Sequence, residues 1–414
     1  MSKRVLLLGY NFFPEPTGIG KYSGEMGKWL ASNGYDCEVV AAYPYYPYWK
    51  VQEPYYKNRF RYTTEVMTTA NGGKLTVHRC PMYVPENPSG LKRMLLDFSF
   101  LFTSFFKVVP MLFKKKFDHV IVVVPSFQFG LLGVLYKKIR GGKFAYHIQD
   151  LQIEAARDLQ MIKSSAVIKA LFGVEKYILK QSDLTSSVGT GMIKRIQEKT
   201  TKPVYFFPNW TDVSAFYPID DKGPLKQEFG LAPTDTVLLY SGAIGEKQGL
   251  EAILYAAETF REQPALKFVI CGSGPYREKL QSLAAKLSLN NVLFLPLQPV
   301  EKFNHFLNMA DVHLVIQKAN AGDLVMPSKL TTVLAVGGLA LITSNSGSGM
   351  YELVEEYNMG LLIKAEDQQA LNEGIRAAIA APHVEIRQNA RRYAEQHLAL
   401  DSVMQAYMAK LEQS

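Results

Sequence analysis

The stretch YSGAIGEKQG, Tyr240–Gly249, stands between an apolar run and a second apolar run of helical periodicity. Gly242 and Gly245 let backbone N–H groups approach a ligand closely, and an expected helix over 250–260 adds partial positive charge at its N-terminus. Lys247 supplies a full positive charge. The pattern predicts the strand-to-helix turn of a parallel sheet that binds an anion such as a diphosphate. The alternative is a tight turn with a solvated lysine.

Short apolar runs like the one before this turn recur along the whole chain. Most are rich in β-branched residues and lack strict alternation, as expected for strands buried on both faces of a parallel sheet. The expected strands are 5–9, 37–42, 76–80, 119–124, 143–148, 184–188, 204–207, 237–241, 267–271, 292–295, 312–316, 339–343 and 360–363. Helical stretches separate many of them, which predicts an α/β protein with two doubly wound, Rossmann-like domains.

Charge is divided unequally between the two halves. Residues 1–205 hold 29 Lys and Arg against 15 Asp and Glu, net +14; the remainder holds 17 against 23, net −6, and the two sum to the +8 of the chain. The stretch 207–224 contains prolines, aspartates and a glycine, as linkers do. We therefore expect an N-terminal domain over 1–206 and a C-terminal domain over 207–385, the basic half facing something anionic.

Composition narrows the class of protein further. The 414 residues are 48% hydrophobic and 20% charged, as in globular proteins. The three cysteines form no CxxC pair or zinc spacing, so disulfides and a structural metal are not expected and a reducing cytoplasm fits. The apolar run after the N-terminal charges is five residues long, typical of a buried strand rather than a signal peptide. No Walker pattern occurs, and the glycine-rich stretch is not a GxGxxG dinucleotide motif.

A second candidate anion site is GDLVMPSKLTTVLAVGG, residues 322–338. Pro327 suits the first position of a helix, and Ser328 and Lys329 follow in the first turn. A lysine there opposes the helix dipole, which argues for a compensating anion. The alternative is a surface lysine on an ordinary helix.

Residues 91–117, LKRMLLDFSFLFTSFFKVVPMLFKKKF, combine an apolar run with basic ends. Asp97, Lys107 and Pro110 argue against a membrane-spanning helix. A basic amphipathic helix lying on an anionic bilayer fits better. The alternative is a crossover helix buried before the next strand. Both interpretations apply if one face of the helix lies on the bilayer and the other in the protein core.

Seven stretches, in order, resemble those of retaining family 4 glycosyltransferases, and among them the members that make colanic acid and other exopolysaccharides. The matching stretches, between about residues 9 and 350, are PEPTGIGKYSGEM, YPYYPYW, HIQDLQIEA, FFPNW, YSGAIGEKQGLE, CGSGP and MPSKLTTVLAVGG. The resemblance implies the GT-B fold, two Rossmann-like domains facing a cleft. It also implies that the last helix, about 386–414, crosses back onto the N-terminal domain.

The resemblance implies catalytic roles for His147 beside the donor sugar and for Lys247 and Lys329 at the leaving diphosphate. The donor-binding residues that it implies are Gly18, Gly20, Gly242, Gly245, Gly274, Asp323, Ser328 and Leu330. Of these, Gly18 and Gly20 follow the first strand and would approach the phosphate of the acceptor or of the donor. The chain departs from the family at three positions: Ala243 replaces an arginine, and Leu324 and Thr332 replace two glutamates. We infer that Lys329 takes the place of the arginine, and Asp323 stands next to the first missing glutamate.

On the acceptor side, Tyr46 and Trp49 belong to an aromatic loop that would stack on a sugar or meet lipid headgroups; aromatic residues buried under a loop are the alternative. Asp150 and Glu154 would bind sugar hydroxyls, or would cap the next helix.

The implied reaction transfers a sugar from a nucleotide-sugar, with GDP-fucose favoured and UDP-sugars next, to a polyprenyl-diphosphate-linked saccharide. The configuration at the anomeric carbon would be retained, without a metal or other cofactor. The enzyme would work in the cytoplasm, peripherally on the inner face of the membrane. Three other classes stay open: a sugar-nucleotide 2-epimerase of the same fold, a two-lobed solute-binding protein and a nucleic-acid binder. The last has little support, because the basic residues form no evident recognition helix.

Overall fold

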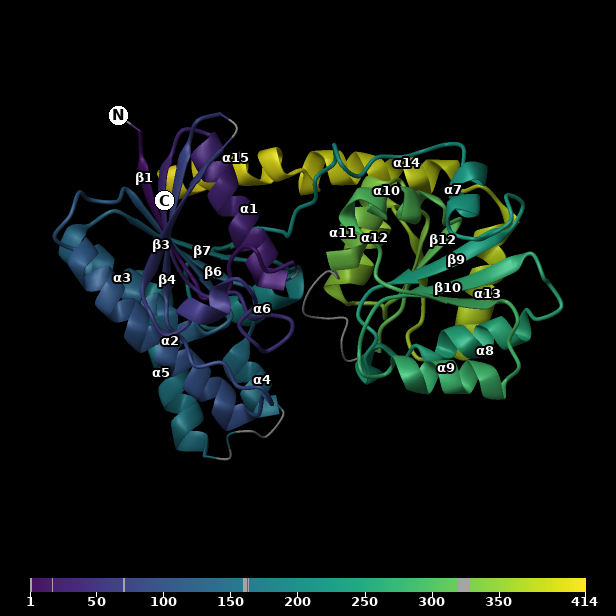
Figure 1. Cartoon of the computed structure of the whole chain (residues 1–414), viewed down its shortest axis with the longest axis horizontal. Helices are drawn as coiled ribbons and strands as arrows, with labels where there is room; N and C mark the ends of the chain where they lie inside the picture. Colours follow the sequence, from purple (N-terminus) through teal and green to yellow (C-terminus); the bar gives the residue numbers. More distant parts are fainter. Residues whose placement is uncertain (1, 17, 70, 159–161, 163, 319–327) are drawn as a thin grey trace. The chain divides into compact units, whose positions relative to one another are not determined.

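A computed structural model describes residues 2–16, 18–69, 71–158, 162, 164–318 and 328–414, without the side chains of Ala155, Asp158, Lys247 and Ser328. The chain forms two compact units (Figure 1). The first comprises 1–188, 192–207 and 404–414, and the second comprises 189–191 and 208–403.

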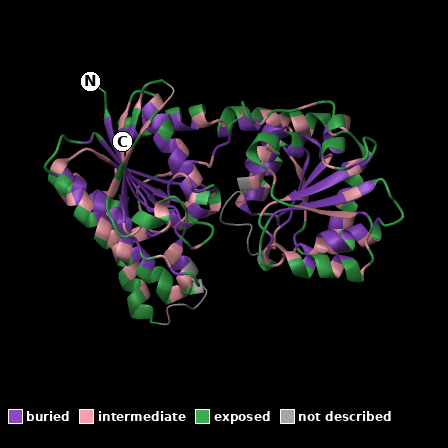
Figure 2. Ribbon diagram, viewed as in Figure 1, coloured by how far each residue is buried: buried purple, intermediate pink, exposed green. Residues whose placement is uncertain are grey.

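The first unit is built on an eight-stranded sheet of order β3-β4-β2-β1-β5-β6-β7-β8. Its strands are β1 Arg4–Leu8, β2 Asp36–Ala42, β3 Thr63–Thr68, β4 Lys74–Cys80, β5 His119–Val124, β6 Lys143–Ile148, β7 Leu184–Ser187 and β8 Val204–Phe206. All neighbours pair in parallel except β3 with β4. Every residue of β1 and β5 is buried, and the strands form the purple centre of the unit in Figure 2. This is the doubly wound sheet that the apolar runs predicted.

The edge strand β3 is the one strand among the described residues that the sequence did not predict. It pairs antiparallel with β4, and its residues alternate between half-buried and exposed. An edge strand with one solvated face has period-two patterning, so it lacks the continuous apolar run by which the other strands were found.

Helices cover both faces of this sheet. Those before residue 208 are α1 Gly18–Ser32, α2 Gly90–Met111, α3 Gly130–Arg140, α4 Gln152–Asp158, α5 Ser165–Gln181 and α6 Thr190–Gln197. The inner face of α2 packs into the core, where the Phe100 ring lies 5.7 Å from that of Tyr10 and 5.1 Å from that of Phe129. The outer face is also apolar but exposed, with Phe102 65% and Phe98 55% accessible. Within the stretch 91–117, the helix α2 ends at Met111 and has one face in the core and one in solvent.

The second unit has a six-stranded parallel sheet of order β11-β10-β9-β12-β13-β14. Its strands are β9 Thr236–Ser241, β10 Leu266–Cys271, β11 Val292–Leu295, β12 Val312–Val315, β13 Ala340–Thr343 and β14 Leu361–Ile363. Alternate residues of β9 point to opposite cores: Leu238 packs with one helical layer and Leu239 with the other. The sheet is therefore buried on both faces.

The helices of the second unit are α7 Gly223–Glu228, α8 Glu251–Thr259, α9 Arg277–Lys286, α10 Val300–Asn308, α11 Ser328–Ala335, α12 Gly349–Tyr357, α13 Gln368–Ala380 and α14 Val384–Tyr393. One core contains residues of α8, α9 and α13. The opposite face is covered by α7 and α10 and by α11, α12 and α14. In Figure 1, α8 and α9 accordingly lie across the sheet from α10.

The C-terminal segment differs from the single helix expected over 386–414. It contains α14, a π-helical turn over Ala394–Leu398 and then α15, Leu400–Gln413. Residues up to 403 belong to the second unit, and 404–414 belong to the first. There the Tyr407 ring stacks on Phe207 with centroids 3.8 Å apart.

Candidate functional site

Two glycine-containing loops meet at the carboxyl ends of β9 and β10. Ile244 donates its backbone N–H to the carbonyl of Ser273 at 2.9 Å. A Cβ on Gly272 would lie 1.8 Å from the carbonyl oxygen of Gly242, and one on Gly274 would lie 2.1 Å from that of Ile244. Both glycines have positive φ, near 155°. The contact between the two loop backbones therefore explains why position 274 is a glycine. Gly274 was predicted to contact the donor.

Lys329, the second residue of α11, lies against the first of these loops. Its Nζ is 4.1 Å from the ring centroid of Tyr240, a residue 1% exposed. The Tyr240 hydroxyl donates to the carbonyl of Ala243 at 2.7 Å and so holds the ring beneath the loop. A Cβ on Gly242 would lie 3.6 Å from Lys329 Cδ, an ordinary van der Waals distance, so the lysine stem lies beside this glycine.

The environment of Lys329 disfavours its own charge. Burial of the ammonium group lowers the pKa of Lys329 to about 7. Among the described residues no carboxylate forms an ion pair with it. The electron-rich face of the Tyr240 ring partly replaces the water that the ammonium group of Lys329 loses on burial. A half-neutralised cation at the N-terminus of a helix is suited to an anionic ligand, which would supply the missing partner.

Lys318 and Gln248 extend this site, and neither was predicted from the sequence. A Cβ on Gly249, whose φ is 68°, would lie 3.5 Å from Cγ of Lys318, so the lysine stem lies over the end of the loop. The Oε1 of Gln248 is buried and receives no hydrogen bond from the described residues. Lys318 lies in the loop that follows β12, Val312–Val315, and a cation in the loop after a parallel strand is the signal that could have identified it.

Other predicted donor residues have different positions. The backbone of Lys247 lies in the 3₁₀ turn Glu246–Gln248 that Gly245 precedes, and Ser328 begins α11, but neither side chain is described. Asp323 lies outside the described residues. The side chain of Leu330 is 0% exposed in the core between α11, α12 and α14, because it lies on the inner face of α11, and its contact with the donor stays a prediction.

In the first unit, Glu15 organises the loops after β1 and β2. It is 2% exposed and accepts hydrogen bonds from Asn11 Nδ2 (2.8 Å) and from the backbone N–H groups of Tyr45 (3.1 Å) and Tyr46 (3.0 Å). Burial raises the pKa of Glu15 to about 7. A Cβ on Gly20 would lie 2.2 Å from Glu15 Oε2. Gly20 thus makes room for this carboxylate, which gives the glycine a structural role, and its approach to a phosphate stays a prediction.

Aromatic residues of the loop after β2 are partly exposed beside Glu15. Tyr46 is 38% exposed, and its ring centroid lies 6.4 Å from that of Trp49. The guanidinium of Arg93, at the start of α2, lies 5.1 Å from the Trp49 ring. Gly18 opens α1 with a φ of 60°, and its Cβ position is 3.8 Å from the Tyr46 ring. These residues, and exposed Asp150 after β6, lie where the strands of a parallel sheet end, the usual position of a ligand.

His147 is not presented to a ligand, contrary to the prediction. Its ring is 1% exposed, with Nδ1 3.0 Å from Ser186 Oγ and with the rings of Phe207 and Tyr407 packed around it. Burial lowers the pKa of His147 to about 3, so the ring is neutral at physiological pH. The sequence could not reveal this, because Tyr407 comes from α15, far along the chain.

Glu154 is also engaged within the first unit, which corrects its predicted contact with sugar hydroxyls. Lys199 Nζ lies 2.6 Å from Glu154 Oε1 and 2.7 Å from Glu175 Oε2, and all three side chains are at most 8% exposed. Burial raises the pKa of Glu175, and the ammonium of Lys199 opposes that rise. The cluster joins α4 and α5 to the turn that follows α6 and is structural.

No group of three or more His, Cys, Asp or Glu side chains in the described part of the chain is placed to hold a metal ion.

Comparison with known proteins identifies both units. Residues 17–210 match the family described as "Glycosyl transferase 4-like domain", and residues 221–397 match "Glycosyl transferases group 1". The chain is 38% identical over 416 residues, 98% of each chain, to a putative colanic acid biosynthesis glycosyl transferase, WcaI, of Escherichia coli strain K12. It is 29% identical over 170 residues to the putative colanic acid biosynthesis glycosyltransferase WcaL of the same strain, covering 40% of this chain and 39% of WcaL.

Solved structures share the fold over the full length of the chain. Sucrose-phosphate synthase from Thermosynechococcus elongatus aligns with a TM-score of 0.74 at 16% identity, covering 100% of both chains. Anabaena Alr3699/HepE in complex with UDP and glucose aligns with a TM-score of 0.69 at 14% identity, also covering 100% of both. WaaG, a glycosyltransferase involved in lipopolysaccharide biosynthesis, aligns with 0.65 at 16%, covering 97% and 98%. The predicted GT-B fold is confirmed.

Proposed function

The chain belongs to the group 1 glycosyltransferase family, and from this premise we propose that it transfers a sugar from a nucleotide-sugar to a lipid-linked saccharide. The configuration at the anomeric carbon would be retained. The product would be part of an exopolysaccharide, as in the biosynthesis of colanic acid for which the WcaI relative is named.

The observation that carries the proposal is the ammonium group of Lys329, held over the Tyr240 ring without a described anionic partner. The diphosphate of the donor would supply that partner, with Lys247 and Lys318 as further cations around the same loop. The backbone N–H groups of Ala243 and Gly245 have no acceptor among the described residues, so they are available to phosphate oxygens. We propose that these groups bind one anionic moiety of the donor.

In the reaction, the bond between the anomeric carbon and the diphosphate oxygen breaks. The acceptor hydroxyl oxygen bonds to that carbon, and its proton passes to the leaving phosphate. Negative charge grows on the diphosphate as the bond breaks, and preorganised lysines and N–H groups stabilise that charge. We propose that this chemistry needs neither a metal ion nor an organic cofactor.

For the donor we favour GDP-fucose, with UDP-sugars next. Named relatives and fold neighbours differ in the nucleotide they are associated with: a mannosyltransferase of Mycolicibacterium smegmatis, 26% identical over 199 residues, is described as GDP-mannose-dependent, whereas the structure of Anabaena Alr3699/HepE is a complex with UDP and glucose. The nucleotide base of the donor therefore differs among these proteins, and the assay must include both GDP-sugars and UDP-sugars.

We propose that the first unit lies peripherally on the inner face of the cytoplasmic membrane. By length and composition α2 is apolar enough to cross a bilayer, but its inner face packs into the core of the unit. Asp97 lies on that inner face and accepts a hydrogen bond from Gln152 at 2.6 Å. The exposed phenylalanines would enter the interface, and Lys114, Lys115 and Lys116 would meet anionic headgroups.

The test incubates the purified full chain with radiolabelled GDP-fucose, UDP-glucose or UDP-galactose and a membrane lipid extract. We expect label to enter the lipid fraction from one donor, also in EDTA. A 2-epimerase would instead convert a UDP-sugar without acceptor, and a solute-binding protein would leave every donor intact; either result contradicts the proposal.

A vesicle sedimentation assay tests the membrane part separately. Binding to anionic vesicles should weaken with salt without vanishing, because salt screens the lysines and not the apolar contact. Replacing Lys114, Lys115 and Lys116 with Glu should release most of the protein while hydrolysis of free donor continues. If the wild-type protein does not sediment with anionic vesicles at low salt, the proposed membrane binding is contradicted.

A further inference from the structure

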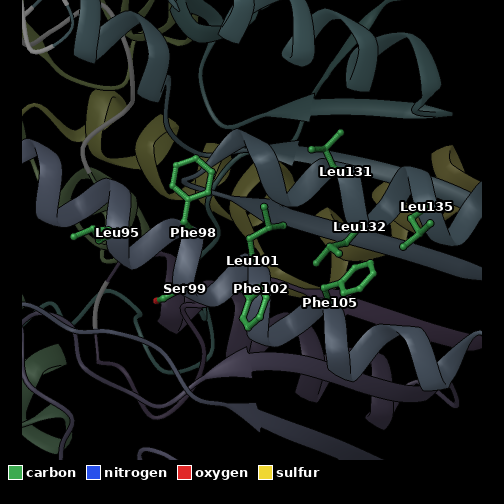
Figure 3. A pocket seen from close by; sticks show the side chains of 9 residues that line it. All are labelled: Leu95, Phe98, Ser99, Leu101, Phe102, Phe105, Leu131, Leu132 and Leu135. Carbon is green, nitrogen blue, oxygen red and sulfur yellow. The ribbon is translucent and has the colours of Figure 1, made fainter.

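An apolar groove of about 800 Å³ runs between α2 and α3 of the first unit. Its rim is exposed and its floor is half-buried or buried, as for Leu132, which is 3% exposed. Figure 3 shows the side chains of the two helices facing each other across it, with Leu101, Phe105 and Leu132 close together. The lining residues are Leu95, Phe98, Ser99, Leu101, Phe102, Phe105, Leu131, Leu132 and Leu135. The volume is within the range of roughly 300–1,000 Å³ that buries small organic ligands.

The groove has no hydrogen-bonding group to offer. Its one polar lining residue, Ser99, donates from Oγ to the carbonyl of Leu96 at 2.8 Å and accepts the backbone N–H of Tyr83 at 2.9 Å. Sugars and nucleotides need polar partners when they leave water, and this groove would leave their polar groups unpaired. Its occupant is therefore a hydrocarbon.

Charge at one end of the groove indicates what the hydrocarbon is attached to. Leu95 of the rim is followed, towards the start of α2, by exposed Arg93 and Lys92. The Arg93 guanidinium lies 5.1 Å from the Trp49 ring, in the aromatic loop at the carboxyl ends of the strands. An anionic group on the end of a chain lying in the groove would thus meet two cations next to the loop that we assign to the acceptor.

We propose that this groove binds the isoprenoid chain of the lipid-linked acceptor, with the acceptor diphosphate at Arg93 and Lys92. The inference rests on the proposed function, since it assumes a lipid-linked acceptor. This differs from docking of the protein on a bilayer, because a single isoprenoid chain leaves the membrane and lies between α2 and α3. Its position in the groove fixes the distance from the lipid to the aromatic loop. The groove thereby favours acceptors whose lipid is an isoprenoid.

The experiment measures binding of soluble probes to the full chain by calorimetry, without detergent or vesicles and below the concentration at which the probes aggregate. The probes are inorganic pyrophosphate, geranyl diphosphate and farnesyl diphosphate, which share a head and differ in chain length. Each isoprene unit that enters the groove should tighten binding by about tenfold or more, because burial of apolar carbon is favourable. Equal affinity for pyrophosphate and farnesyl diphosphate would overturn the proposal.

Two variants fill the groove from opposite walls: Leu101→Trp on α2 and Leu135→Trp on α3. Both positions are half-buried, so a larger side chain can extend into the groove. Because the two substitutions are on different helices, one variant remains informative if the other fails to fold. We expect each to lose at least tenfold in affinity for farnesyl diphosphate while still sedimenting with anionic vesicles. The control is Phe113→Ser, because Phe113 is 85% exposed and outside the groove. Unchanged farnesyl diphosphate affinity in a folded groove variant contradicts the proposal.

Two further readouts separate this inference from its alternatives. Dimerisation that depends on concentration and that Leu101→Trp abolishes, without chain-length-dependent binding, would assign the groove to a second copy of the chain. Nucleotide binding, followed by thermal shift, should be the same in both groove variants and the wild type. Failure to bind any nucleotide would refute the proposed function, whereas chain-length-dependent binding of the probes would still stand.

Discussion

The Nζ of Lys329 lies 4.1 Å from the ring centroid of Tyr240, although the two residues are far apart in the sequence. The ring replaces part of the water that the ammonium loses on burial. Tyr240 is itself held by its hydrogen bond to the carbonyl of Ala243 in the glycine-containing loop. The position of the loop and the position of the cation are therefore coupled through one aromatic ring.

Removing the Lys329 charge should impair catalysis without impairing folding. Lys329→Met keeps the apolar stem and should reduce kcat/KM by about 10²–10³-fold, as for loss of one preorganised donor to a developing charge. The free energy of unfolding should stay equal or rise, because the desolvated ammonium group of a half-buried residue is removed. Turnover of the donor and thermal unfolding are measured together, with Lys286→Met on α9 as the matched control. Wild-type kcat/KM in Lys329→Met would remove this lysine from the mechanism.

The lowered pKa of Lys329 predicts a pH dependence of nucleotide binding. The free protein loses this charge above about pH 7, whereas a bound diphosphate favours the ammonium form. Binding should therefore take up a proton near neutral pH and weaken as the pH rises above 7. Calorimetry in buffers of different ionisation enthalpy measures the uptake. Lys329→Arg keeps its charge and should bind with little pH dependence; the same slope in both proteins would contradict the assignment.

The lowered pKa of Lys329 also predicts how the free energy of unfolding changes with pH. The folded pKa is depressed from 10.5 to about 7, so between these pH values the unfolded chain binds a proton that the folded chain does not. The contribution of Lys329 to the free energy of unfolding should therefore rise with pH across this window. Urea unfolding of wild type and Lys329→Met at several pH values isolates this contribution as their difference, which should shrink as the pH rises.

The contact between the two loops predicts an unequal response to Gly→Ala. A Cβ on Gly272 would lie 1.8 Å from a backbone oxygen, and its φ is positive, so Gly272→Ala should cost about 3 kcal/mol or more in strain and displacement. Gly230→Ala is the control, because Gly230 also has positive φ (79°) but nothing lies within 4 Å of its Cβ position; about 1–2 kcal/mol is expected. Urea unfolding compares them, and equal losses would contradict the close contact.

The ion-pair cluster at Lys199 predicts a large effect on stability. Lys199→Met would leave the buried carboxylates of Glu154 and Glu175 without their cation, which should cost about 3–5 kcal/mol. The triple variant Lys199→Met, Glu154→Gln, Glu175→Gln should recover most of that loss. Chemical unfolding measures both proteins. A single variant as stable as the wild type would show that the cluster is solvated.

The burial of His147 predicts a structural rather than a catalytic phenotype. His147→Asn should lower the free energy of unfolding by about 1–3 kcal/mol through the altered hydrogen bond to Ser186 and the lost ring packing. Activity per folded molecule should be unchanged. Turnover is normalised to the folded fraction measured by circular dichroism. Loss of activity in fully folded His147→Asn would restore its predicted role.

The sequence by itself determined the parallel strands of the two sheets and the loop at Tyr240–Gly249, but not the antiparallel edge strand β3. The runs 119–124 and 143–148 are β5 and β6 because strands buried on both faces must be continuously apolar. The expected helix after the glycine-containing loop is α8, and the lysine of the second anion site lies in the first turn of α11. These are local properties, fixed by periodicity and by residues whose backbone preferences act over a few positions.

Only the tertiary structure decided what each candidate side chain contacts. His147 is in a core because α15 places Tyr407 beside it, and Gly20 is small because Glu15 occupies the space of its missing side chain. Lys329 is a desolvated cation because β9 places Tyr240 under it. Burial and pKa depend on partners contributed by distant segments, and a motif within one segment carries no record of those partners.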